Sequence, residues 1–210
     1  MNDTRNRWFF CVGATLILTG VFACLRVQAL QSGVREEVLR LHIVANSDTP
    51  CDQAVKIKVR NRILQDCGML FADCASQEEA ASIARERSGL ICRVAEKALR
   101  ENGVFYPVSV RVEECRFPTK SYGGVRLPAG RYTAVNLRIG AGMGQNWWCV
   151  MYPPLCLTGD AVKADEQTLA QLRKELSAEE YALVTETSSI QVKVKFRIAE
   201  WLGKRFINLF

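Results

Sequence analysis

The segment Gln145-Asn146-Trp147-Trp148-Cys149-Val150-Met151-Tyr152-Pro153-Pro154-Leu155-Cys156 combines two adjacent tryptophans, a Pro-Pro pair and two cysteines separated by six residues. Each proline lacks a backbone donor and fixes φ, so the pair is incompatible with a regular helix or a central strand. We therefore expect residues 145–156 to form a stiff, aromatic-rich loop. No ordinary catalytic group stands beside it in the sequence, so we interpret it as an element for packing or recognition.

The two cysteines of this segment are the best candidates for a disulfide. Pro153-Pro154 can turn the chain between Cys149 and Cys156, and a bridge closing so short a loop stabilises by about 2–3 kcal/mol if unstrained. The chain has nine cysteines, one histidine and no Cys-x-x-Cys pair, so a zinc site is a poor fit. Seven cysteines remain once residues 1–29 are set aside. Outside the cytosol, this odd number implies a free thiol or an intermolecular bond.

Periodicity and turn signals predict the remaining elements. Alternating apolar and polar residues, or dense apolar runs, predict strands at residues 38–45, 107–112, 131–139 and 190–198. Start and stop signals predict helices at residues 49–66, 76–102 and 165–176, a short helix from residue 177 and a final helix at residues 201–210. Turn residues predict a loop at residues 117–124. The order predicts an α/β (α+β) fold, in which a single mixed sheet packs with two or three helices.

Residues 55–60 carry conflicting signals. Apolar side chains at positions 55, 57 and 59 alternate with basic ones, which favours a strand. Thr49 as an N-cap, Pro50 at the first helical position and Asp52 in the first turn favour a helix. We predict a helix, because no turn signal interrupts the chain before residue 66.

The N-terminus has the pattern of an export segment. Arg5 and Arg7 precede an apolar run at residues 8–25, and Val27-Gln28-Ala29 supplies compact residues for cleavage after Ala29. The run is also just long enough for an uncleaved membrane anchor. A lipoprotein box at residues 21–24 is weakened by the bulky Phe22, and the terminal position argues against a buried core helix.

We therefore predict a signal peptide or membrane anchor at residues 1–29, a main domain at residues 36–158 and a C-terminal extension at residues 160–210. The formal net charge of the chain is +6, and it falls to +4 when residues 1–29 are removed. This mild positive excess is compatible with lying near an anionic membrane surface. It is too diffuse to support nucleic-acid binding.

Two groups of residues resemble a catalytic triad and a phosphate-binding loop, but each lacks the flanking sequence that such a site requires. Cys149, His42 and Asp48 can be written as the triad of a thiol hydrolase, but no family-specific nucleophile signature surrounds Cys149. The glycine-rich residues 140–144 follow a predicted strand, yet they match neither the Walker nor the dinucleotide pattern. We expect His42 to be a strand histidine and residues 140–144 to be a mobile connection that positions the tryptophan pair.

The aromatic residues of the 145–156 segment are candidate contact residues. Trp147, Trp148 and Tyr152 could stack on sugar rings or anchor a protein partner, or they could be buried beneath the sheet. We expect at least one tryptophan to be buried and the other to be free for contact.

Four motifs in one order identify a resemblance. They are Leu41-His42-Ile43-Val44-Ala45-Asn46-Ser47-Asp48 with Asp52-Gln53, Phe117-Pro118-Thr119-Lys120-Ser121-Tyr122-Gly123, Pro128-Ala129-Gly130-Arg131-Tyr132, and residues 140–156. With them, the chain resembles the stage II sporulation protein R family of endospore-forming bacteria. The resemblance runs from about residue 39 to residue 157 and is only loose after residue 160.

The resemblance implies signalling rather than catalysis. Proteins of this family are made in the forespore and exported into the space between the forespore and mother-cell membranes. There they trigger a membrane-embedded aspartic protease that removes the pro-sequence of sigma-E. This implies a non-enzymatic protein without cofactor or metal. Its first candidate contact surface is Trp147, Trp148 and Tyr152, and its second is His42, Asn46 and Asp48.

Overall fold

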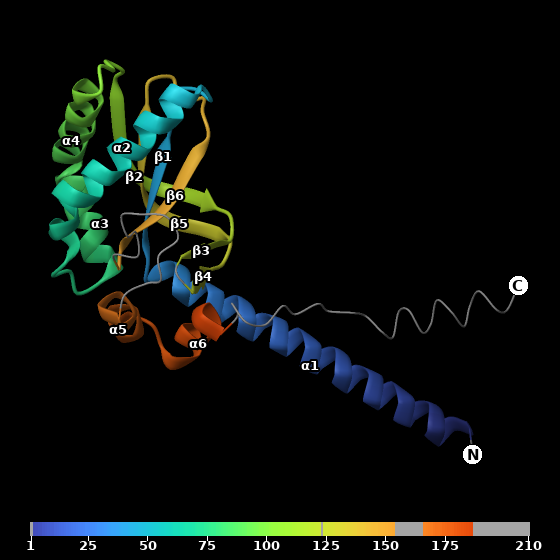
Figure 1. Cartoon of the computed structure of the whole chain (residues 1–210). Coiled ribbons are helices and arrows are strands. Elements are labelled where there is room, and N and C mark those ends of the chain that lie inside the picture. The colour runs from blue at the N-terminus through green and yellow to red at the C-terminus, as the bar shows by residue number, and fades with distance from the viewer. Residues whose placement is uncertain (1, 123, 154–165, 187–210) are drawn as a thin grey trace, which may run out of the picture.

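A four-stranded mixed sheet organises the protein. The computed structural model describes residues 2–122, 124–153 and 166–186 (Figure 1). In space the strands follow the order β2 (Val108–Phe117), β5 (Gly130–Ile139), β1 (Leu39–Val44) and β6 (Asn146–Tyr152). β1 is parallel to β5, and the other two pairings are antiparallel. The predicted fold class, a mixed α+β fold, is confirmed.

Three helices cover one face of the sheet (Figure 1). They are α2 (Pro50–Cys67), α3 (Gln77–Glu86) and α4 (Ser88–Glu101), with a short 3₁₀ turn, η1 (Gly68–Phe71), after α2. Leu39, Leu41 and Ile43 of β1 point into this layer and are fully buried. Apolar strand residues at alternate positions therefore form the main core, as expected for a half-covered sheet.

The helix predicted at residues 49–66 is confirmed as α2. Thr49 caps it by accepting a hydrogen bond from the Asp52 N–H, and Pro50 is its first residue. Val55, Val59 and Ile63 are buried at a spacing of four residues, so the packing follows the helical period. The helix predicted at residues 76–102 is interrupted at Arg87. Ser88 and Gly89 follow the break, and both are weaker helix formers than alanine.

The opposite face of the sheet is covered over only part of its length. Its apolar cluster contains Ala134 and Val150 from the large sheet, Val38 just before β1, and Val125 and Leu127 from the small sheet. The small sheet pairs β3 (Lys120–Tyr122) with β4 (Val125–Leu127). The same cluster is closed by α5 (Glu166–Glu175), α6 (Ala178–Glu186) and the end of α1. The strand predicted at 190–198 and the helix predicted at 201–210 lie outside the described residues.

Two loop predictions are wrong. Residues 146–152 form the strand β6 at an edge of the described sheet, and the prolines follow the strand instead of interrupting it. Their missing donors therefore remove no bond from the pairing with β1. Residues 117–124 were expected to be a loop, but β2 extends to Phe117 and residues 120–122 form β3. Pairing with β1, which is distant in sequence, decided the first segment. In the second, Phe117 pairs with Gly130 of β5, and β3 pairs with its sequence neighbour β4 in a hairpin.

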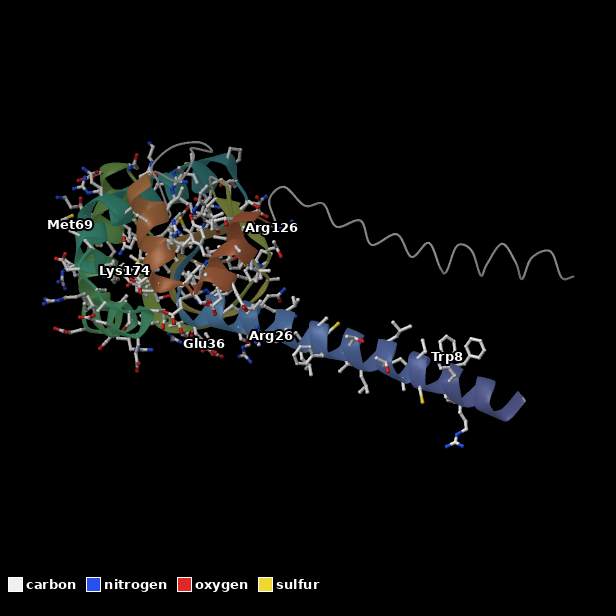
Figure 2. All side chains as sticks on the ribbon, turned by 90° about the horizontal axis from the view of Figure 1, so that it is seen from below. Trp8, Arg26, Glu36, Met69, Arg126 and Lys174 are labelled. Atoms are coloured by element: carbon white, nitrogen blue, oxygen red, sulfur yellow. The ribbon has the colours of Figure 1, made fainter. Side chains whose placement is uncertain are left out.

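The N-terminal helix leaves the folded body and then runs alone. α1 (Asn2–Glu36) is continuous, and its part Arg7–Glu36 is long and apolar enough to cross a membrane. Trp8 lies far out along it, as Figure 2 shows. At the other end Val34 is fully buried in the body, and Arg26 pairs with Glu179 of α6 at 2.9 Å. The apolar stretch is thus joined to the body by continuous helix.

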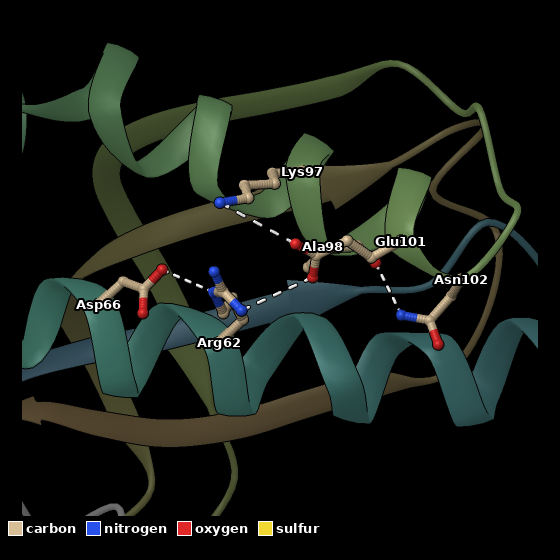
Figure 3. A network of polar contacts seen from close by, with 6 residues as sticks. All are labelled: Arg62, Asp66, Lys97, Ala98, Glu101 and Asn102. Atoms are coloured by element: carbon tan, nitrogen blue, oxygen red, sulfur yellow. Dashed lines mark hydrogen bonds and ion pairs between the residues drawn. The ribbon is translucent and has the colours of Figure 1, made fainter.

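Surface charge contributes little to holding the helices together. Arg62 of α2 pairs with Asp66 at 2.6 Å and with Glu101 of α4 at 3.6 Å, and Asn102 donates to the Ala98 carbonyl (Figure 3). These groups are partly exposed, and such pairs are each worth about 0–1 kcal/mol. The buried apolar residues between α2 and α4 therefore dominate this contact.

Candidate functional site

One row of side chains crosses all four strands on the incompletely covered face. Trp148 of β6 pairs with His42 of β1, His42 with Asn136 of β5, and Asn136 with Arg111 of β2. Paired residues of adjacent strands point to the same face of a sheet. We call Trp148, His42, Asn136 and Arg111 the cross-strand row.

His42 is held tightly within this row. Its ring stacks on Trp148 with centroids 4.1 Å apart and planes inclined by 9°, and Phe117 meets Trp148 edge-on at 4.7 Å. Burial lowers the pKa of His42 despite a hydrogen bond to Asn146. The ring is therefore neutral at pH 7. Since Nε2 lies 2.8 Å from Asn146 Oδ1, an acceptor, Nε2 carries the proton and Nδ1 the lone pair.

A polar hollow adjoins the row on its β2 side. It has a volume of about 120 Å³ and is lined by Ser109, Arg111, Glu113, Asn136 and Arg138. Asn136 donates through Nδ2 to Glu113 Oε1. Both arginines are exposed. This half of the sheet face is therefore polar and open, whereas the half beside β3 and β4 is apolar and covered.

Two of the predicted contact residues, Asn46 and Asp48, hold the turn before β6 through hydrogen bonds to its backbone. Asn46 accepts from the Ala141 N–H at 2.9 Å, and Asp48 accepts from the Gln145 N–H at 2.7 Å. The Asn46 carbonyl accepts from the Met143 N–H. The predicted mobile connection at residues 140–144 is thus a turn fastened onto the segment that follows β1. Asn46 and Asp48 position this turn, and only Asp48 is exposed.

Asp52 completes this network from the first turn of α2. It is 4% exposed and accepts hydrogen bonds from Ser47 Oγ and from Asn46 Nδ2, the latter at 2.9 Å. The Ser47 hydrogen bond, followed by that from Asn46, lowers the pKa of Asp52. A carboxyl whose pKa is lower in the folded state than in the unfolded state stabilises the fold. Its full contribution is present above the unfolded-state pKa of about 4 and is lost as the pH falls through the folded-state pKa.

This arrangement predicts an acid-sensitive contribution to stability. At neutral pH, Asp52→Asn should lower the denaturant midpoint, because the ionised acceptor is lost. As the pH falls from about 4 toward the lower folded pKa, the difference between the wild type and the variant should shrink. Unfolding curves of both proteins at pH 7, 4 and 3 measure it. A difference that does not change with pH would show that ionised Asp52 contributes nothing.

The two adjacent tryptophans lie on opposite faces of the sheet. Trp148 belongs to the cross-strand row, whereas Trp147 packs against the helical layer with Arg60 stacked 4.3 Å from its ring. Trp147 Nε1 is buried without a hydrogen-bond partner in the described part of the chain. The pair therefore forms no common platform for stacking on a sugar.

Tyr152 must be removed from the candidate contact residues. Its side chain is fully buried, and its hydroxyl donates to the Cys74 carbonyl at 3.0 Å. A register shift in the pairing of β6 with β1 near Leu39 accompanies this placement. Tyr152 thus fixes the end of β6 against the loop before α3.

The thiol hydrolase constellation does not assemble. Cys149 is disulfide-bonded and packs in the helical layer, whereas His42 lies on the other face of the sheet. Asp48 binds the Gln145 backbone and not His42. Cys156, the predicted partner of Cys149, lies outside the described residues, so the pairing remains a prediction. Within the described residues, no group of three or more His, Cys, Asp or Glu side chains is arranged to hold a metal ion.

Arg40 is a buried residue that sequence analysis missed. It is fully buried, donates from Nε to the Cys149 carbonyl at 2.8 Å and from Nη2 to the Tyr122 hydroxyl at 2.7 Å. Its guanidinium carbon lies 4.3 Å from the Phe117 ring centroid and 4.9 Å from that of Tyr132. Burial lowers its pKa. In the sequence, a strand arginine between apolar residues resembles a surface position. In the fold, Phe117 of β2, Tyr132 of β5 and Tyr122 of β3 enclose it.

Comparison with known proteins identifies one family. A family model described as stage II sporulation protein R matches residues 35–163, which include every described strand. The chain is 32% identical over 216 residues to Stage II sporulation protein R of Bacillus subtilis (strain 168), covering 93% of this chain and 96% of that protein. No solved structure matches the chain.

Proposed function

The chain belongs to the stage II sporulation protein R family, which gives it a role in sporulation, and from this premise we propose that it is an exported signal between compartments. In this proposal it activates the membrane-embedded aspartic protease of the mother cell that processes pro-sigma-E. It acts from the space between the forespore and mother-cell membranes. It works by binding, without catalysis of its own.

The observation that carries the proposal is the N-terminal helix. Its part Arg7–Glu36 can cross a membrane, and the helix continues into the folded body, where Val34 is buried. About 20 residues of helix span the hydrocarbon core of a bilayer. The helix fits a signal or an anchor, and in the anchored form it holds the body directly at the membrane surface. That is where the extracytoplasmic part of a membrane protease would be reached.

Activation by binding sets an energetic requirement. A ligand shifts an equilibrium only by its difference in affinity for the two states. Turning a protease from mostly inactive to mostly active needs a difference of about 5 kcal/mol. A few desolvated contacts to the active state can supply this amount. The exposed part of the cross-strand row is one surface on which such contacts can form.

Reconstitution in a non-sporulating host tests this function. The full chain, the cognate membrane protease and pro-sigma-E are co-expressed, and removal of the pro-sequence is followed by gel. We expect processing only when the chain is present and exported. The matched control lacks residues 1–29 and so remains in the cytoplasm, where it should be inactive.

Two outcomes would contradict the proposal in different ways. Absence of processing with all three proteins present and the chain exported would refute activation. Equal processing with the chain that lacks residues 1–29 would refute the need for export.

A further inference from the structure

We propose that the open half of the sheet, beside the cross-strand row, binds an acidic peptide segment of a protein partner. The segment places a carboxylate on Arg111 and Arg138, and it offers an N–H donor to His42 and Asn136. This inference rests on the proposed function, namely that the chain acts by binding a protein.

The first support is a pair of guanidinium groups that lack an anion. Arg111 and Arg138 lie on adjacent strands, point to the same face and line the same hollow. In the described part of the chain neither forms an ion pair, and the polar contact of Arg138 is a long one, 3.4 Å, to the Gly142 carbonyl. Glu113 follows Arg111 on the same face of β2, on the side away from Arg138, and accepts from Asn136. Guanidinium groups in this position suit a carboxylate, which accepts two parallel N–H bonds.

The second support is a pair of buried acceptors that lack a donor. His42 Nδ1 and Asn136 Oδ1 are buried without a hydrogen-bond partner in the described residues, and His42 pairs with Asn136 across the two strands. Nδ1 bears a lone pair because Nε2 donates to Asn146, and Oδ1 remains because Nδ2 donates to Glu113. Buried polar groups in native proteins almost always have partners. Two neighbouring acceptors therefore indicate a ligand that donates hydrogen bonds.

Together these groups select one chemistry. An acidic residue in an extended peptide carries a carboxylate and a backbone N–H within a few ångströms of each other. Trp148, stacked on His42, provides an apolar wall beside them. A lipid phosphate would satisfy the arginines, but it offers no donor to the two acceptors. The open half also lies at the end of β1 away from α1 (Figure 1), and thus away from a membrane that α1 would span.

Charge reversal in the reconstituted system tests the site. Arg111→Glu combined with Arg138→Glu should slow processing of pro-sigma-E by at least roughly tenfold, since like charges then face each other. The matched control, Arg126→Glu with Lys174→Glu, makes the same change in net charge at exposed positions on other elements, labelled in Figure 2, and should process normally. Circular dichroism checks that both variants fold. If the charge-reversed variant does not fold, the double variant Arg111→Gln with Arg138→Gln replaces it. This variant removes the two charges without reversing them.

The decisive step is restoration. Single Asp or Glu residues in the extracytoplasmic segments of the protease are changed to Lys in the presence of the reversed chain. Recovery of processing by one such change would establish the carboxylate contact. Normal processing by the reversed chain would overturn the site and leave the proposed function intact. Loss that no change in the protease restores would also overturn it, and it would favour a phosphate. In both cases, processing by the wild-type chain in the same host shows that the proposed function holds and that only the proposed site is wrong.

Discussion

Arg40→Ala is expected to lower the free energy of unfolding by about 3–5 kcal/mol, because it leaves a cavity among the aromatic rings that enclose the guanidinium. Arg40 is fully buried against Phe117, Tyr132 and Tyr122. It links β1 to the β6 backbone through the Cys149 carbonyl and to β3 through the Tyr122 hydroxyl.

Methionine at the same position should restore most of that loss. Arg40 Nη1 is buried without a partner in the described part of the chain, and no carboxylate there pairs with the guanidinium. Its burial therefore carries a large desolvation cost, and replacing buried charges by apolar side chains of similar volume is often neutral or stabilising. Tyr122 still has the Trp148 carbonyl as acceptor, at 3.1 Å. We expect Arg40→Met to unfold within about 1.5 kcal/mol of the wild type.

Denaturant unfolding in mild detergent, followed by tryptophan fluorescence, measures both variants. Arg126→Ala and Arg126→Met provide the matched control, because Arg126 is exposed on β4, and both should stay within about 0.5 kcal/mol of the wild type. If Arg40→Met were as unstable as Arg40→Ala, the positive charge itself would be required, and the account based on volume would be wrong.

The sequence predicted the elements better than it predicted the site. Capping by Thr49 and Pro50 identified α2 correctly against an alternating pattern, because cap residues act locally and their effect survives tertiary packing. Residues 146–152 were misassigned, because the prolines that follow them are a local signal, whereas the strand forms through pairing with distant β1. Local signals thus sufficed for α2, but they missed the break between α3 and α4, and long-range pairing decided the edge strand.

The cross-strand row shows why the site was only partly predictable. The residue types of His42 and Trp148 made them candidates from the sequence alone. Asn136, Arg111 and Arg138 occupy alternating positions that are typical of the solvent-facing side of a strand. What joins them is register: His42 opposite Asn136, and Asn136 opposite Arg111. Register depends on which strands are neighbours and cannot be deduced from one strand alone. The prediction that Tyr152 is a contact residue was wrong because burial also depends on distant elements. An aromatic residue beside prolines has the sequence context of an exposed loop, but η1 and the loop before α3 cover Tyr152 in the fold.

Gly144→Ala is expected to lower the free energy of unfolding by about 3 kcal/mol, a large effect for one methyl group. An added Cβ would lie 2.6 Å from the Ser47 carbonyl carbon, still closer to its oxygen, and 2.9 Å from Ala45 Cβ. The Ser47 oxygen also accepts from Gln53 Nε2 of α2, so it has little freedom to move away. The methyl group must therefore separate the turn before β6 from the segment after β1.

That separation would break hydrogen bonds as well as packing. The Gly144 N–H donates to the Ala45 carbonyl at 2.9 Å, and the Met143 and Gln145 N–H groups donate to Asn46 and Asp48. Gly89→Ala is the matched control, since its added Cβ meets only Arg93 Nη1 at 3.6 Å, and a helical alanine should be neutral or stabilise by up to about 1 kcal/mol. The same unfolding curves compare the two variants. Equal stability would mean that the turn can move without cost, and then Asn46 and Asp48 could not be said to fix the start of β6.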